Sequence, residues 1–319
     1  MKAIVYSKYG SPEELHLSEV ESPVPGDKDV LVKVHAVSVN RSDWESLTGK
    51  PLYARLGGFF KPRNPILGSD VAGTVETVGS ANTCFKPGDE IFGEMEDYHG
   101  GFAEYVSTKA AIWAKKPPGL SFEQAAAIPQ AGVIALQGLQ KAHVQSGQHV
   151  LINGAGGGAG VFAIQLAKMY GAEVTGVDNR GKLDFMRSIG ADHVIDYLEK
   201  DFSRHANQYD VILDLVATRS VFAIARALKP GGTYYAVGGS APTLLQIFFL
   251  GPLFKIRGHK KIAILGVDRN RKDLEKVTEL CESGQLKVPI DQHYALSEVP
   301  KALEYLGEGG SKGKLVIIL

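Results

Sequence analysis

A glycine-rich segment is the clearest chemical signal in the chain. It follows the apolar run Val150–Ile152 and reads G-A-G-G-G-A-G. Glycine lets the backbone bend sharply and approach a pyrophosphate, and the amides of the helix that follows attract the phosphates. Both G-x-G-x-x-A and G-x-x-G-x-x-G fit, and the strand-to-helix context predicts a dinucleotide turn, with a flexible loop as the alternative. The predicted contacts are Gly154, Ala155, Gly156, Gly157, Gly158, Ala159 and Gly160.

The residues that would choose the coenzyme follow the second strand pattern. Asp178 lies about twenty positions after the glycines, where an acidic residue accepts hydrogen bonds from the ribose hydroxyls of NAD. Arg180 and Lys182 follow at once, and basic groups there hold the 2′-phosphate of NADP. The two signals conflict, so either coenzyme, or both, fits.

The elements around this turn alternate between strand and helix. Helical stretches are expected at Gly160–Tyr170 and Lys182–Ile189, each ended by glycine. Strands joined by such crossovers describe an α/β fold with a doubly wound parallel sheet of the Rossmann type. Gly238 follows the fifth strand and should face the coenzyme at the carboxyl edge of the sheet. The predicted strands are His149–Asn153, Glu173–Val177, His193–Asp196, Asp210–Leu213, Thr233–Val237 and Ile262–Val267.

The rest of the chain has a different pattern. Before residue 121 short β-branched runs are separated by Pro and Gly clusters, and Phe122–Ala142 is rich in Ala, Leu and Gln at helical spacing. After residue 268 two helix patterns, Arg271–Glu282 and Val299–Leu306, precede a closing strand, Lys314–Ile318. We therefore expect a β-rich catalytic domain at 1–125, a dinucleotide-binding domain at 126–267, and a return to the first domain at 268–319.

Composition excludes several classes of protein. The 319 residues carry 35 Lys and Arg against 35 Asp and Glu, which gives no electrostatic case for nucleic acid. With only Cys84 and Cys281, neither a disulfide framework nor a four-cysteine zinc site can form. The N-terminus lacks the apolar core of a secretory signal, and Leu244–Phe254 is too short to span a bilayer. A cytoplasmic enzyme without an integral membrane segment is expected.

Segments spread along the whole chain resemble the medium-chain dehydrogenase/reductase superfamily, within it the zinc-independent NAD(P)H:quinone oxidoreductase group. Ser38–Asp43 is similar to the family's Ser-x-Asn-x-x-Asp segment, and Ile128–Ala135 to its Leu-Pro-x-Ala-Gly-x-Thr-Ala segment. Lys312–Val316 resembles the terminal Gly-Lys-x-Val segment. The resemblance implies a GroES-like catalytic domain beside the Rossmann domain, and a homodimer in which Ile262–Val267 pairs with its symmetry mate.

Departures from the zinc-dependent relatives indicate the reaction. Those relatives hold catalytic zinc through a Cys near the position of Asn40 and a Gly-His-Glu, where this chain has Gly68-Ser69-Asp70. Without thiolate and imidazole no site prefers zinc, and alcohol oxidation loses its Lewis acid. We therefore expect hydride transfer from NAD(P)H to a lipophilic quinone or an activated C=C bond. The alternatives are a zinc-independent alcohol dehydrogenase and a non-catalytic nucleotide-binding sensor or structural protein.

The resemblance also assigns residues. NADPH-preferring relatives hold the 2′-phosphate with a Lys and a Tyr matching Lys182 and Tyr197, which tips the balance toward NADP(H) with NAD(H) as the alternative. Ile134 replaces the usual Thr beside the nicotinamide, and Lys314 is placed with the coenzyme-binding residues. The expected catalytic residues are Asn40, Asp43 and Tyr53. Helix capping by Asn40 and Asp43, and core filling by Tyr53, are the structural alternatives. Tyr98 and His99 are weaker candidates for proton transfer, with a surface turn as the simpler interpretation.

Overall fold

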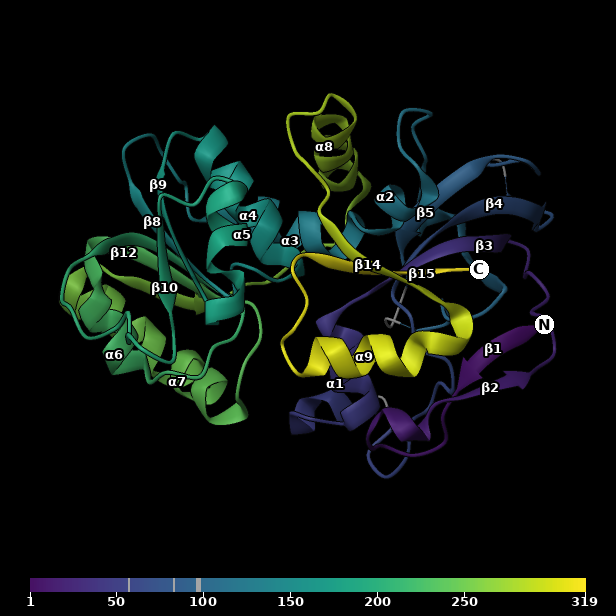
Figure 1. Ribbon diagram of the computed structural model, residues 1–319, viewed down its shortest axis with the longest axis horizontal. Helices are drawn as coiled ribbons and strands as arrows, with labels where there is room; N and C mark the ends of the chain where they lie inside the picture. The colour runs from purple at the N-terminus through teal and green to yellow at the C-terminus, as the bar shows by residue number, and fades with distance from the viewer. Residues whose placement is uncertain (57, 83, 96–98) are drawn as a thin grey trace. The chain divides into compact units, whose positions relative to one another are not determined.

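The computed structural model describes residues 1–56, 58–82, 84–95 and 99–319 (Figure 1). The chain divides into two compact units, one formed by Met1–Gln130 with Arg269–Leu319 and the other by Ala131–Asp268. The second unit is a parallel α/β sheet and the first is a mainly antiparallel β structure with helices. The predicted α/β fold class, with a Rossmann sheet and a separate β-rich unit, is confirmed.

The second unit contains a six-stranded parallel sheet in the order β10-β9-β8-β11-β12-β13. The central strands are almost entirely buried, as expected for a sheet covered by helices on both faces. Asn153 at the end of β8 is in register with Asp214 at the end of β11, so their side chains share the carboxyl edge. The strands are β8 (His149–Asn153), β9 (Glu173–Asp178), β10 (His193–Asp196), β11 (Tyr209–Asp214), β12 (Leu228–Ala236) and β13 (Lys261–Ile264).

Five longer helices accompany this sheet in the described residues, and one of them begins in the first unit. They are α3 (Pro129–Lys141), α4 (Gly158–Met169), α5 (Leu183–Ser188), α6 (Val221–Ala227) and α7 (Ala241–Gly258). The predicted helical stretch Phe122–Ala142 is interrupted: α2 (Phe122–Ala126) ends and α3 starts at Pro129. Proline has no N–H for the helix ladder, so it begins a helix more readily than it continues one.

The first unit contains a seven-stranded sheet in the order β14-β15-β3-β4-β5-β7, with β6 also paired to β3, and a separate β1–β2 hairpin. The closing strand β15 pairs antiparallel with β3, which places Leu315 opposite Val39. The strands are β1 (Lys2–Val5), β2 (His16–Glu19), β3 (Asp29–Val39), β4 (Asp70–Val78), β5 (Glu90–Glu94), β6 (Tyr105–Lys109), β7 (Trp113–Lys115), β14 (Ile290–Ala295) and β15 (Lys314–Ile318).

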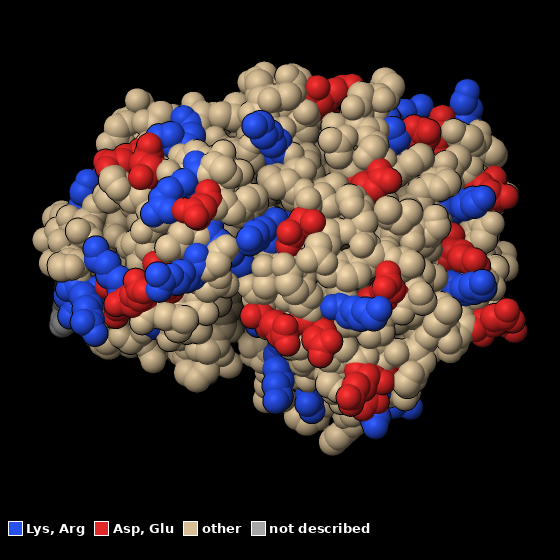
Figure 2. All heavy atoms as spheres, viewed as in Figure 1, with Lys and Arg blue, Asp and Glu red and all other residues tan. Residues whose placement is uncertain are grey.

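Three further helices belong to this unit: α1 (Arg41–Thr48), α8 (Arg271–Glu282) and α9 (Val299–Gly307). Its core is built from apolar residues of β3, β4, β15 and α9, including Val37, Val71, Leu315 and Leu303. Acidic and basic side chains are interspersed over the face in Figure 2, in keeping with the neutral net charge. Within the described residues, no helix combines the length and apolarity needed to cross a membrane.

Candidate functional site

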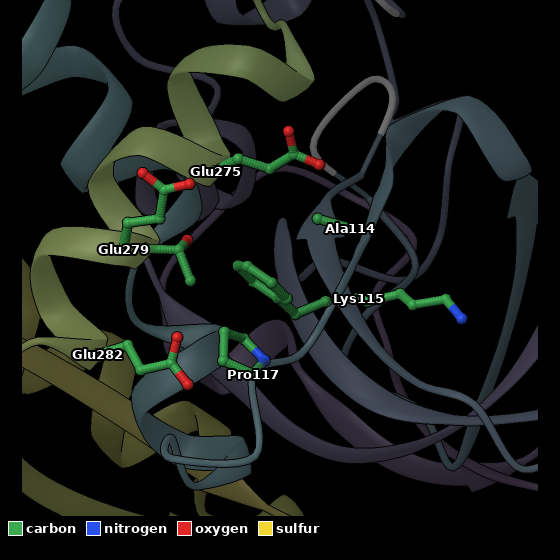
Figure 3. Close-up of a pocket in the computed structure, with 8 residues that line it drawn as sticks. Ala114, Lys115, Pro117, Glu275, Glu279 and Glu282 are labelled. Atoms are coloured by element: carbon green, nitrogen blue, oxygen red, sulfur yellow. The ribbon is translucent and has the colours of Figure 1, made fainter.

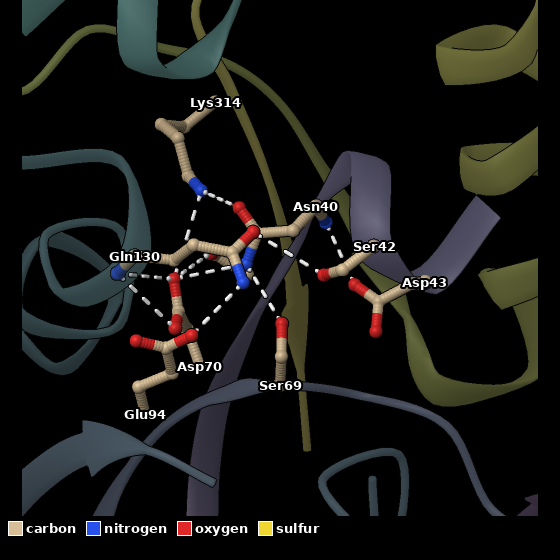
Figure 4. Close-up of polar contacts among 9 residues, drawn as sticks. Asn40, Ser42, Asp43, Ser69, Asp70, Glu94, Gln130 and Lys314 are labelled. Carbon is tan, nitrogen blue, oxygen red and sulfur yellow. Dashed lines mark hydrogen bonds and ion pairs between the residues drawn. The ribbon is translucent and has the colours of Figure 1, made fainter. Parts of the chain in front are cut away.

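A buried polar cluster lies in the first unit where several strands begin or end (Figure 4). The Nζ of Lys314 donates a hydrogen bond to Asn40 Oδ1, and the Nδ2 of Asn40 donates to Asp70 Oδ2 and Ser69 Oγ, both at 2.9 Å. Lys314 Nζ also lies 3.9 Å from Asp70 Oδ2. These four residues are all buried. The two N–H groups of the Asn40 amide are therefore both engaged, and its orientation is fixed.

The sheet explains why residues far apart in sequence meet here. Asn40 follows β3, Asp70 begins β4, Glu94 ends β5 and Lys314 begins β15, and these strands are neighbours. The cluster continues into α3, because the N–H of Gln130 donates to both Asp70 oxygens, at 3.2 and 3.3 Å. The side chain of Gln130 donates to Glu94 at 3.0 Å and accepts from Ser42 Oγ at 3.2 Å.

Asp43 is fully buried beside this cluster, and its contacts are with the backbone. Its Oδ2 accepts from the N–H of Asn40 at 2.7 Å and its Oδ1 from the N–H of Gly68 at 3.1 Å. The first bond closes the N-terminus of α1, with Asn40 as the N-cap residue. Asp43 therefore has the capping contacts considered above, and a catalytic role for Asn40 and Asp43 remains a prediction.

Burial dominates the electrostatics of the cluster. It raises the pKa of Asp70 to about 7 even though the Lys314 ammonium opposes the shift, and it raises the pKa of Asp43 to about 7. Burial likewise raises the pKa of Glu94, while Arg269, whose Nε lies 3.4 Å from Glu94 Oε1, opposes that rise. Burial lowers the pKa of Lys314, and the three carboxyls oppose that change.

The donor set of this cluster does not fit zinc. Zinc sites in proteins are built from thiolates, imidazoles and carboxylates arranged around a cation. Here the groups are an amide, a hydroxyl, carboxyls and an ammonium, and the ammonium already supplies a positive charge. No group of three His, Cys, Asp or Glu placed to hold a metal was found across the described ranges.

The predicted dinucleotide turn joins β8 to α4 in the second unit. Gly154 has φ +83°, in the left-handed region that favours glycine. A Cβ on Gly160 would lie 2.4 Å from the Gly154 carbonyl oxygen, so only glycine allows the helix to pack this closely on the turn. Gly157 is the N-cap of α4, and the amides of Gly158, Ala159 and Gly160 start the helix, where amides have no intrahelical partner. This geometry fits a pyrophosphate.

Asp178 and Lys182 form a buried ion pair under this turn. Lys182 Nζ lies 3.2 Å from Asp178 Oδ1, which also accepts from the N–H of Asn179 at 2.9 Å. Asp178 Oδ2 accepts from the N–H of Gly156 at 3.0 Å. Both side chains are at least nine-tenths buried. The carboxylate that should repel a 2′-phosphate is thus partly neutralised by the lysine that should bind one.

The other predicted coenzyme residues of this unit are more exposed. Arg180 is exposed and pairs with Glu199 at 3.2 Å, and Tyr197 is about half exposed. Ile134 is half-buried on α3. Gly238 follows β12, with no heavy atom within 4 Å of where a Cβ would be, so this turn leaves open space.

A buried polar group at the carboxyl edge of this sheet was not predicted. Asp214 Oδ1 accepts from Asn153 Nδ2 at 2.7 Å and from the N–H of Val216 at 3.1 Å, and Asp214 Oδ2 accepts from the Tyr234 hydroxyl at 3.0 Å. Burial raises the pKa of Asp214, and its three donors oppose the shift. The sequence could have predicted this group, because each of two apolar strands ends in a polar residue: β8 in Asn153 and β11 in Asp214.

Two further candidates have different outcomes. Tyr53 is half-buried in the short helix Leu52–Arg55, and its hydroxyl lies 3.5 Å from Glu45 Oε2. Tyr98 lies outside the described residues.

The first unit also has a pocket of about 190 Å³ between α8 and β5–β7 (Figure 3). It is lined by Phe92, Lys115 and the α8 carboxylates Glu275, Glu279 and Glu282, and it includes none of the predicted site residues.

The fold and the glycine turn define a dinucleotide-binding protein of the dehydrogenase class. Residues 26–118 match the family described as "Alcohol dehydrogenase GroES-like domain", and residues 189–317 match the one described as "Zinc-binding dehydrogenase". The chain belongs to the medium-chain dehydrogenase/reductase superfamily and, within it, to the quinone oxidoreductase group.

Similar sequences and structures cover nearly the whole chain. The 2-methylene-furan-3-one reductase of Solanum lycopersicum is 34% identical over 99% of this chain and 79% of its own length. The quinone oxidoreductase of Homo sapiens is 31% identical, over 100% of this chain and 98% of that protein. The structure of the quinone oxidoreductase from Coxiella burnetii has a TM-score of 0.89 and 31% identity, covering 100% of this chain and 99% of that one. The Escherichia coli quinone oxidoreductase complexed with NADPH has a TM-score of 0.86 and 25% identity, with both chains fully covered.

Proposed function

We propose that this protein transfers a hydride from NADPH to a quinone, or to the activated C=C bond of an enone, without zinc. The observation that carries the proposal is the cluster around Lys314, in which an ammonium, an amide and a hydroxyl stand where zinc ligands are expected. Electron-poor acceptors need less help from a Lewis acid than alcohols do. Relatives named as reductases of quinones and of 2-methylene-furan-3-one support this substrate class.

The residues of each unit have a separate role in the proposed reaction. The bound coenzyme supplies the hydride, and Gly154–Gly160 bind its pyrophosphate through backbone amides. Asp178 and Lys182 face the adenosine end. In the first unit Lys314 and Asp70 hold the Asn40 amide in one orientation, so Asn40 acts as a positioning residue for the acceptor.

The direct test is a panel of initial rates. Purified protein is mixed with NADPH or NADH and with benzoquinone, phenanthrenequinone, methyl vinyl ketone or a simple alcohol, and the nicotinamide absorbance is followed, with and without a chelator. We expect NADPH oxidation with quinone or enone acceptors that the chelator does not change. Absence of oxidation with every quinone and enone contradicts the proposed function, and loss of the activity on chelation contradicts its zinc-independent form.

We propose NADPH as the preferred coenzyme because Lys182 lies under the glycine turn and balances Asp178. Lys182→Met should weaken NADPH binding at least about tenfold, since a charge-assisted contact to phosphate is lost, and should change NADH binding much less. Arg187→Met is the matched control, because Arg187 is exposed, is paired with Asp184 and is not among the predicted coenzyme residues. Equal effects of Lys182→Met on both coenzymes, measured by quenching of protein fluorescence, contradict this assignment.

We also propose a homodimer formed through β13. This strand ends the six-stranded sheet and pairs with β12 alone within the described part of the chain, so its other edge is available to a symmetry mate. Sedimentation at micromolar concentration should give twice the chain mass, and a monomer there contradicts the proposal. The names of relatives place some in chloroplasts and others in mitochondria, so a cytoplasmic location stays a prediction.

A further inference from the structure

The buried carboxyl group of Asp214 is not balanced by a cation of its own. Its side chain is fully buried at the end of β11. The buried Asp178, in contrast, pairs directly with the ammonium of Lys182. No Lys, Arg or His of the described ranges lies within ion-pair distance of Asp214, and Arg219, which acts on it from farther away, is paired with Asp201 at 2.9 Å. Burying an unbalanced carboxylate is costly, so its presence here calls for a reason.

The hydrogen bonds around Asp214 are those of the ionised form. The amide N–H of Asn153 and the backbone N–H of Val216 both donate to Oδ1, at 2.7 and 3.1 Å, and neither group can accept a proton in return. The Tyr234 hydroxyl donates to Oδ2 at 3.0 Å. Three neutral donors offset part of the cost of burial but leave the charge in place. The carboxyl edge of this sheet therefore holds a fixed negative charge away from water.

The order of the strands places this charge at the coenzyme crevice. β8 and β11 are neighbours in the order β10-β9-β8-β11-β12-β13, and the chain proceeds outward from them in opposite directions. In such a sheet a dinucleotide lies across the carboxyl ends of these two strands. The loop after β11 reaches the glycine turn, because the Cγ2 of Val216 lies 2.9 Å from where a Cβ on Gly154 would be. Asp214 thus lies at the base of the loop that borders the turn.

The same order indicates which half of the coenzyme lies nearer to Asp214. Asp178 and Lys182 follow β9, on one side of β8, and they face the adenosine end in the function proposed above. β11 lies on the other side of β8, so the nicotinamide half is expected to extend toward β11. This step rests on the proposed function, since it requires that the glycine turn binds a nicotinamide coenzyme.

We propose that the buried carboxylate of Asp214 stabilises the oxidised coenzyme relative to the reduced one, and so favours donation of the hydride. The acceptor takes the hydrogen with both electrons of its bond and then a proton from water, and the nicotinamide ring is left with one positive charge. A fixed anion favours that charge without any rearrangement of the protein. Asp214 is buried beneath its loop and acts through its charge, not through contact with either reactant.

The affinities of the two coenzyme forms separate this role from a structural one. NADP⁺ and NADPH differ by one charge on the ring, so a residue that only holds the loop against the turn should affect both alike. Asp214→Asn removes the charge and keeps the size of the side chain. We expect it to raise the ratio of the NADP⁺ Kd to the NADPH Kd at least about fivefold, which is a modest interaction between two unit charges in a protein. Isothermal titration calorimetry on the full chain at one fixed pH gives both values.

The matched control is Tyr234→Phe. It removes a hydrogen bond from the same carboxyl group but keeps the carboxyl itself, so the ratio should stay within about twofold of the wild type. A second pair of variants does not disturb the buried group. Val216 is 50% exposed, so Val216→Lys adds a cation on the same loop and should raise the ratio, whereas the neutral Val216→Met should not.

The outcomes distinguish this inference from the proposed function. If Asp214→Asn weakens both coenzyme forms equally, or if Val216→Lys and Val216→Met have the same ratio, the inference is overturned and the proposed function stands. If the wild type binds neither NADPH nor NADP⁺, the proposed function is contradicted and the inference is lost with it. If Asp214→Asn does not fold, the two Val216 variants decide the question.

Discussion

Replacing Lys314 by methionine should show how much its ammonium stabilises the ionised carboxyls of the buried cluster. The side chain is 1% exposed, and its Nζ lies 3.9 Å from Asp70 Oδ2, which is fully buried. At an effective dielectric constant of about 20, two charges at that distance interact by about 4 kcal/mol. Removing one partner of a buried pair costs about 3–5 kcal/mol. Methionine keeps the apolar volume, so we expect a loss of this size in the free energy of unfolding at alkaline pH.

The pH dependence distinguishes this cause from a packing defect. The pKa of Asp70 is about 7 in the folded protein, and without the ammonium it should rise further. Between the two values the loss grows by about 1.4 kcal/mol for each pH unit, which gives about 2.7 kcal/mol near pH 9. The full loss is reached only above both values, where Asp70 is ionised in both proteins. As the pH falls through about 7 the carboxyl is protonated in both, so the missing partner costs less. The loss should therefore be large near pH 9 and small near pH 5, where Asp43 and Glu94, the other carboxyls facing Lys314, are also less charged.

Urea unfolding at the two pH values measures the difference. Lys312→Met is the matched control, because Lys312 is exposed two residues away, and its effect should stay within about 0.5 kcal/mol. If Lys314→Met is unfolded near pH 9, its refolding near pH 5 likewise shows that the loss of stability depends on ionised carboxyls. A loss below about 1 kcal/mol near pH 9, or an equal loss at both pH values, would refute the reasoning.

Two other substitutions test the second unit by urea unfolding. Gly160→Ala should lower the free energy of unfolding by about 1–3 kcal/mol and weaken coenzyme binding, because its Cβ would lie 2.4 Å from the Gly154 carbonyl oxygen. Gly238→Ala places its Cβ in open space, so it should change the free energy of unfolding by no more than about 0.5 kcal/mol. Equal stability of the two variants contradicts this reasoning. Asp214→Asn should cost about 1–3 kcal/mol, because the new amide turns a donor toward Asn153, Val216 or Tyr234; an unchanged stability would show that the three bonds contribute little.

Local pattern was sufficient for elements whose ends are marked in the sequence. The predicted strand His149–Asn153 and the predicted helix Arg271–Glu282 have the observed bounds. In the helix, Asn270 accepts from the N–H of Asp273 as a cap. In the strand, an apolar run ends at the first glycine of the turn, so periodicity and terminator agree.

Pattern failed where a partner element decided the outcome. The predicted strand Ile262–Val267 was too long, since β13 ends at Ile264. Its neighbour β12 ends at Ala236, in register with Ile264, and then enters the turn containing Gly238. Beyond that point β12 no longer offers backbone partners to β13. The residues after Ile264 are still mostly apolar, so the sequence of the strand alone does not predict where it ends.

Lys314 shows why the candidate site could only partly be predicted. Family resemblance selected Asn40 and Lys314 separately and placed the lysine with the coenzyme, while the structure places its ammonium on Asn40, 274 residues earlier in the chain. That contact depends on the register of β15 with β3, which sets Leu315 opposite Val39. Buried carboxyls such as Asp70 and Asp43 are costly without a compensating charge. The last strand therefore brings the balancing cation as it completes the sheet, so loss of β15 should unbalance the cluster as well as remove a strand.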